Sequence, residues 1–183
     1  MTGDAEVGGP PRAAMIAALV LAVATIVAIL AFAAIRHTSS QPVTLPAVPA
    51  PQAASPACRA LLDALPRQLG DFQRAELAQP APESTSAWRS GTATEPVVMR
   101  CGLQRPADFV VGSPIQVVDK VQWFQVSEQG SSEEGRSTWY TVDRPVYVAL
   151  TLPANSGPVP IQTLSGVIDH TIAAVPIDPG SPR

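Results

Sequence analysis

Hydrophobic residues follow three different patterns along this chain. The first is a continuous run, residues 14–35, in which twenty-two residues carry no charge and are mostly Ala, Val, Ile and Leu. At about 1.5 Å of rise per residue, a helix of this length spans roughly 33 Å, enough to cross a hydrocarbon core of about 30 Å. Because no polar stripe interrupts the run, it predicts one transmembrane helix rather than a helix of a soluble core.

This helix has two possible roles. The sequence Ala-Phe-Ala at 31–33 has the small residues that a signal peptidase accepts, which predicts a cleaved signal peptide and a secreted protein. The run is longer than the core of an ordinary signal peptide, about 7 to 15 residues, and two acidic residues accompany the single arginine of the tail before it. These features favour an uncleaved signal anchor.

Residues 36–57 show no hydrophobic period and contain five prolines among Ala, Val, Ser and Gln. Proline fixes φ and removes a backbone donor, so such a segment favours extended polyproline II. At about 3.1 Å per residue, the whole segment would reach roughly 70 Å. We therefore expect a linker between the membrane and the domain that follows.

The second pattern is the helical period, which occurs at both ends of the remaining chain. Near its start, Ser55 suits a cap and Pro56 a first helical position, and several apolar residues follow on one face: Cys58, Leu61, Leu62, Leu65 and Leu69. A closing helix begins at Pro160 and has its own apolar stripe: Ile161, Leu164, Val167, Ile168 and Ile172. Each helix has one face to bury.

The third pattern is alternation, which predicts strands. The segments concerned are 74–78, 96–101, 115–126 (one long, bulged strand), 136–142 and 146–152. Short connections between them favour an antiparallel meander. Each of the two helices has one apolar face, which it can bury against such a sheet. The pattern therefore predicts an α+β two-layer sandwich, with a sheet of about four to five strands and both helices on one face of it. The domain is expected over 58–175, and residues 176–183 as a flexible tail.

Charge and cysteine content restrict the function. From residue 58 onward the chain has ten basic and thirteen acidic residues, and its only lysine is Lys120. Because nucleic-acid binding requires a basic surface, nucleic acid is not an expected partner. The only cysteines, Cys58 and Cys101, follow the apolar run. No further Cys or His occurs near either of them at the spacing typical of metal ligands. A disulfide in an oxidising compartment is the simplest interpretation. It predicts an extracytoplasmic domain and a cytoplasmic tail, residues 1–13.

No catalytic residue, metal ligand or cofactor motif is predicted. Ser165, Asp169 and His170 are neighbours on one helix, where they do not form the geometry of a triad. One cluster suits a binding surface, because arginine and aromatic side chains dominate binding hot spots: Arg100, Trp123, Trp139, Tyr140 and Arg144. The competing interpretation is structural, with the aromatic side chains in the core and the arginines paired with Asp119 or Asp143.

Several short motifs carry a family resemblance. They follow the membrane segment and the proline-rich spacer in this order: CRALL at 58–62, Leu65-Pro66, Ala87-Trp88, VMRCG at 98–102, VQW at 121–123 and RPVYV at 144–148. The chain from Cys58 to Val175 thereby resembles an actinobacterial family of small, exported, membrane-anchored proteins that carry a domain of unknown function. The resemblance implies a place in the cell envelope and no particular activity.

We expect a non-enzymatic interaction module, held in the plasma membrane by one helix, that binds an envelope protein. A small-ligand or lipid-binding domain, with its pocket between sheet and helices, is the first alternative. An enzyme acting on cell-wall material is the second, and it is disfavoured because the acid, base and nucleophile set is missing.

Overall fold

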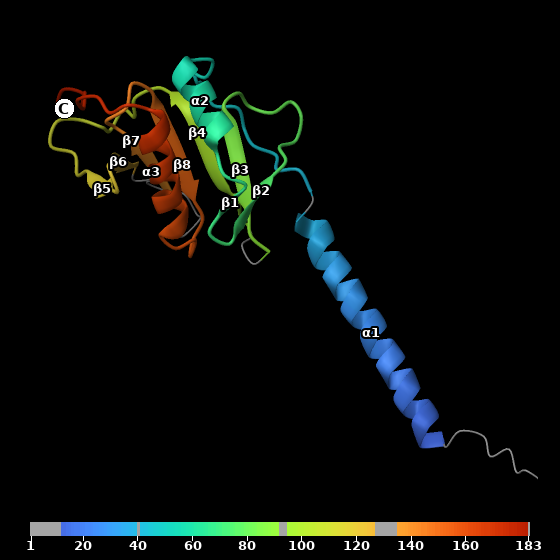
Figure 1. Cartoon of the computed structure of the whole chain (residues 1–183). Coiled ribbons are helices and arrows are strands. Elements are labelled where there is room, and N and C mark those ends of the chain that lie inside the picture. Colours follow the sequence, from blue (N-terminus) through green and yellow to red (C-terminus); the bar gives the residue numbers. More distant parts are fainter. Residues whose placement is uncertain (1–11, 40, 92–94, 127–134, 183) are drawn as a thin grey trace, which may run out of the picture. The chain divides into compact units, whose positions relative to one another are not determined.

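The computed structural model describes residues 12–39, 41–91, 95–126 and 135–182, and the chain divides into two units, Met1–Thr38 and Ser39–Arg183. The first contains helix α1 (Arg12–Ser39), drawn in blue in Figure 1. Its side chains from Ala13 to Phe32 are exposed, and this stretch is long and apolar enough to cross a membrane. An N-terminal helix of this kind fits a signal anchor or a signal peptide.

The second unit is built on one antiparallel sheet of eight strands in the order β1-β2-β3-β4-β8-β7-β6-β5. Two four-stranded meanders meet where β4 pairs with β8 in the middle. The first meander comprises β1 (Gln68–Leu69), β2 (Phe72–Ala75), β3 (Thr85–Arg89) and β4 (Val97–Leu103). The second comprises β5 (Gln116–Val118), β6 (Val121–Val126), β7 (Ser137–Thr141) and β8 (Tyr147–Leu152).

Two helices, α2 (Pro56–Ala64) and α3 (Val159–Thr171), pack against each other on one face of this sheet, as Figure 1 shows. The predicted start of α2 is confirmed: the Ser55 side chain accepts a hydrogen bond from the Cys58 amide at 3.3 Å, and Pro56 is the first helical residue. The largest fully buried side chains between helices and sheet are Trp88, Trp123, Leu61, Leu69, Met99, Leu150, Leu164 and Ile168. The α+β architecture with two helices on one face is thus present.

The predicted number of strands, four to five, was wrong. The segment 115–126 forms two strands, because the chain reverses at Asp119, which has a φ of 52°. Strand β3 lies in a segment where no strand was predicted, and β1 has only two residues, too few to show alternation. The remaining predicted strands correspond to β2, β4, β7 and β8.

The proline-rich segment is not a linker over the whole of 36–57. Val43 is only 2% exposed, its amide donates to Glu76 O at 2.7 Å, and its carbonyl accepts from the Ala78 amide at 2.9 Å. Farther along, the Gln52 amide donates to Gly102 O at 3.0 Å. Residues from Val43 onward therefore belong to the folded domain, and only three residues separate Val43 from the end of α1 at Ser39.

The C-terminal residues also differ from the flexible tail expected over 176–183. The Val111 amide donates to Gly180 O at 3.0 Å, and the Gly180 amide donates to Phe109 O at 2.9 Å. Arg105 pairs with Asp178 at 3.4 Å. These contacts attach the segment up to Gly180 to the connection between β4 and β5.

Candidate functional site

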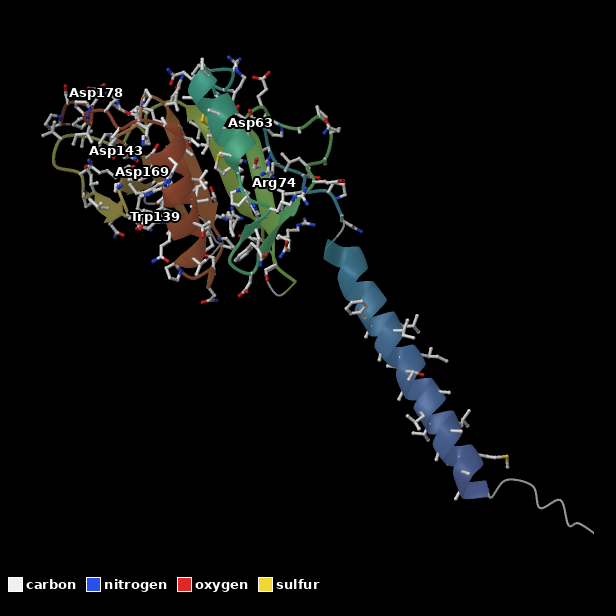
Figure 2. All side chains as sticks on the ribbon, viewed as in Figure 1. Asp63, Arg74, Trp139, Asp143, Asp169 and Asp178 are labelled. Atoms are coloured by element: carbon white, nitrogen blue, oxygen red, sulfur yellow. A yellow bond between two sulfur atoms is a disulfide. The ribbon has the colours of Figure 1, made fainter. Side chains whose placement is uncertain are left out.

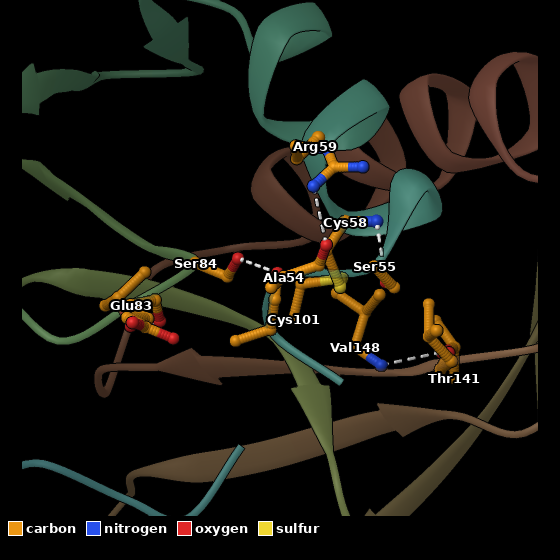
Figure 3. The surroundings of a disulfide bond; sticks show 12 residues. Ala54, Ser55, Cys58, Arg59, Glu83, Ser84, Cys101, Thr141 and Val148 are labelled. Carbon is orange, nitrogen blue, oxygen red and sulfur yellow. Dashed lines mark hydrogen bonds between the residues drawn. A yellow bond between two sulfur atoms is a disulfide. The ribbon is translucent and has the colours of Figure 1, made fainter. Parts of the chain in front are cut away.

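The predicted disulfide between Cys58 and Cys101 is formed, and both residues are fully buried. Figure 3 shows that it joins the first turn of α2 to β4. Close by, the Ser84 hydroxyl donates to Ala53 O at 2.6 Å, which holds the chain just before the helix. The bond therefore connects the helical layer to the middle of the sheet, and it indicates an oxidising, extracytoplasmic compartment.

The face of the sheet away from the helices carries a row of three aligned residues. Neighbouring residues of a strand point to opposite faces, so Cys101 faces the core and Arg100 the outer face. Arg100 is opposite Ala149 of β8, which is opposite Tyr140 of β7. With strands about 4.8 Å apart, the backbones of Arg100 and Tyr140 are roughly 10 Å apart, and the small Ala149 side chain lies between them.

A cleft of about 460 Å³ lies over this row. Its floor is the outer face of β4, β8 and β7, including Thr138 and Thr151, whose hydroxyls hydrogen-bond each other at 3.1 Å. One wall is part of the proline-rich segment, residues 43–48, which we call the proline wall. The other lining residues are Arg89, Pro96, Val98, Arg100, Leu103, Arg136, Tyr140 and Ala149.

The charges in the cleft have one sign. Three arginines line it, and among the described residues no lining residue is acidic. Arg89 donates to Gln41 O at 2.9 Å, and Arg136 forms an ion pair with Glu95, which lies outside the lining. Arg100 differs, because its Nε is buried and has no hydrogen-bond partner in the part of the chain that the structure describes.

Burial lowers the pKa of the Arg100 guanidinium, while the neighbouring Tyr140 raises it. An arginine side chain keeps its charge at all ordinary pH values. Burial therefore removes water from a charged guanidinium, which is energetically unfavourable. Such a cation is stabilised when a negatively charged group enters beside it. The chemistry that this cleft supports is therefore the binding of an anion.

The other members of the predicted binding cluster lie elsewhere, so the five residues do not form one surface. Trp123 is fully buried in the core, and its indole N–H donates to Ser165 Oγ at 2.9 Å. Trp139 donates to Ser137 Oγ at 3.0 Å and lines a second cavity, of about 450 Å³, beside the start of α3. Both are on the helix side of the sheet, whereas Arg100 and Tyr140 face the opposite side.

Arg144 has a structural environment. Its side chain is fully buried, with Nη1 at 2.8 Å from the Asp143 carboxylate and Nη2 at 3.5 Å from Asp169. Nη2 also donates to Lys120 O at 3.1 Å. Figure 2 shows Asp143 near Asp169 of α3, as expected for two carboxylates that pair with the same arginine. The pairing with Asp143 agrees with the structural interpretation of this arginine.

The residues of the rejected triad also remain separate from the cleft. Ser165 is buried and accepts the Trp123 indole N–H, while His170 is exposed on α3, where its ring lies 2.6 Å from Gly166 O. Across the described ranges, no group of three or more His, Cys, Asp or Glu residues has the arrangement of a metal site.

The proline wall and the two flanking arginines, Arg89 and Arg136, were not predicted to be parts of a site. The only local signal was the strand parity that sets Val98 and Arg100 opposite Cys101. The proline wall gave no such signal, because its position depends on hydrogen bonds to residues more than thirty positions away.

Fold and site together define a disulfide-linked α+β domain preceded by an apolar helix. Comparison with known families identifies the group: a family model described as "Protein of unknown function (DUF3515)" matches residues 19–177, and the chain belongs to this family. No curated protein and no solved structure matches the chain.

Proposed function

We propose that this protein is a membrane-anchored, non-enzymatic binding module of the cell envelope, which holds its ligand in the Arg100 cleft outside the plasma membrane. The anchor is α1, whose apolar stretch is long enough to span. The disulfide supports the extracytoplasmic side, because disulfides persist in oxidising compartments. With three residues between Ser39 and Val43, the tether is short, since an extended chain covers at most about 3.6 Å per residue.

The observation that carries the binding role is the Arg100 guanidinium, whose buried Nε has no hydrogen-bond partner, in a cleft without acidic lining among the described residues. A volume near 460 Å³ is typical of sites for small ligands. The lining supplies arginine, tyrosine and threonine donors beside apolar side chains. Such a set favours holding a ligand over transferring protons or attacking a bond.

The position of the domain can be tested with the only lysine, Lys120, whose side chain is 80% exposed. A membrane-impermeant amine reagent applied to intact cells should label Lys120, and the conservative variant Lys120→Arg should abolish the labelling. Labelling that requires broken cells would place the domain in the cytoplasm and refute the proposal.

Occupancy of the cleft can be tested by photo-crosslinking in the native membrane. Val48 is 43% exposed on the proline wall, so benzoylphenylalanine at this position should crosslink a ligand in the cleft. Asp63, exposed on α2 outside the cleft, provides the control position. The Val48 product should disappear when Arg100 is changed to Ala and persist when Arg67, exposed elsewhere, is changed to Ala. Identical products from both positions, insensitive to Arg100, would contradict a binding role for the cleft.

A further inference from the structure

We infer that the ligand of the cleft is a small amphipathic oxyanion, in which a carboxylate or phosphate head group is joined to an apolar chain. This inference rests on the proposed function, and it adds the chemical class of the ligand. Two independent features of the lining carry it: the cation and donors at the floor, and the apolar surface of the proline wall.

The head group is assigned by the donors on the floor. The Arg100 guanidinium presents several N–H groups in a planar fork, which matches the oxygens of a carboxylate or phosphate. Tyr140 lies in the same cross-strand row, and Thr138 and Thr151 follow in the adjacent row. A cationic ligand is disfavoured, because three arginines line the cleft and no acidic residue does so among those described.

The apolar chain is assigned by the wall and rim. Pro46 and Val48 are exposed and Leu45 is half-buried along one side, and the half-buried Pro96 adds aliphatic surface to theirs. Val43, Val98 and Leu103 also line the cleft but are themselves buried. A small hydrophilic anion would use the floor alone and leave this surface in water. An acyl or alkyl chain covers it, and each methylene removed from water strengthens binding. The combination therefore selects an amphipathic anion over inorganic phosphate.

The two tyrosines of the chain, Tyr140 and Tyr147, allow a direct test. Tyr140 lines the cleft, whereas Tyr147 packs beside Phe109, Phe124 and Val142 outside it. Full-length protein labelled with 3-fluorotyrosine, in neutral dodecyl maltoside micelles, gives two ¹⁹F signals, which Tyr140→Phe and Tyr147→Phe assign. The probes are octyl phosphate, octanoate, octanol and inorganic phosphate.

Octyl phosphate or octanoate should shift the Tyr140 signal saturably and leave the Tyr147 signal in place. Affinity for inorganic phosphate should be at least tenfold weaker than for octyl phosphate, and octanol should give no saturable shift. If octyl phosphate binds more tightly, the head group is a phosphate, as in phospholipids; if octanoate does, it is a carboxylate, as in fatty acids.

Two variants connect the shift to the cleft. Arg100→Gln should weaken the tighter probe at least tenfold, because a charge-assisted hydrogen bond is lost. Val48→Glu should weaken it as well, since it places a negative charge on the exposed rim of the cleft. The matched control Arg67→Glu, which changes charge on an exposed residue outside the lining, should have no effect.

Octanol binding as tightly as octanoate, or octyl probes binding equally to wild type and Arg100→Gln, would overturn the inference. So would the absence of any saturable shift. The binding role itself has a separate criterion: Arg100-dependent crosslinks from Val48 would stand even if all octyl probes failed, and the ligand would then belong to another class.

Discussion

Removal of the disulfide should cost much of the stability of the domain. Cys58 and Cys101 are 43 residues apart, so the bond closes a loop of about 44 residues in the unfolded chain. The chain-entropy relation gives about 4 kcal/mol for a loop of this length at 25 °C. The double variant Cys58→Ala/Cys101→Ala should therefore lose at least about 4 kcal/mol, because both side chains are fully buried and their removal also loosens the packing.

The assay is urea unfolding of the full-length protein in detergent, followed by tryptophan fluorescence. All three tryptophans, Trp88, Trp123 and Trp139, lie in the domain, so α1 does not contribute to the signal. With an m-value of about 2 kcal/mol/M, the midpoint should fall by about 2 M. Wild-type protein unfolded in reductant should show most of this loss. A midpoint shift below about 0.5 M in both samples would refute the loop-closure reasoning.

Three further predictions use the same unfolding assay. Arg144→Ala should destabilise the domain by about 3–5 kcal/mol, because Asp143 is left buried without its cation; an unchanged midpoint would contradict a structural role. Gly102→Ala should destabilise more than Gly112→Ala: both have positive φ, but an added Cβ meets the Ala53 backbone at 2.3 Å only at Gly102. Equal losses would show that residues 52–53 do not pack there. Burial raises the pKa of Tyr147 above its ordinary 10.0, so the neutral phenol stabilises the fold below pH 10 and this contribution disappears as the pH rises further. Tyr147→Phe should flatten the decline, and an unchanged slope would assign it to other groups.

Local sequence signals predicted the elements that depend on local physics. The cap at Ser55 and the proline after it set the start of α2, and the parity of Val97, Met99 and Cys101 placed all three in the core. The disulfide followed from a simple count of cysteines. These features involve residues within one helix or one strand, or a residue type with few alternatives.

The errors concern structure that only distant contacts determine. Strand β3 contains Ser86 and Trp88 on one face and lacks a clear apolar alternation, so its pairing with β2 and β4 makes it a strand. Prolines argued against regular structure before residue 56, yet Val43 is fixed by backbone hydrogen bonds to the segment after β2. Propensity gives no information about such contacts.

The candidate site also depends on contacts between residues that are distant in the sequence. Arg100 and Tyr140 are forty positions apart in the sequence and share one cross-strand row only because β4 and β7 both pair with β8. Trp123 and Trp139, which share their residue type with binding hot spots, face the helices because of strand parity and fill the core or border the second cavity. Composition identified suitable side chains, and topology decided which of them share a cleft.

Native mass spectrometry of the full-length protein, released from its own membrane in mild detergent, tests the central claim most directly. We expect one bound anion of defined mass per chain in the wild type and in Arg67→Gln, and its loss in Arg100→Gln. Identical spectra for all three proteins, with or without a bound molecule, would contradict a ligand held by Arg100.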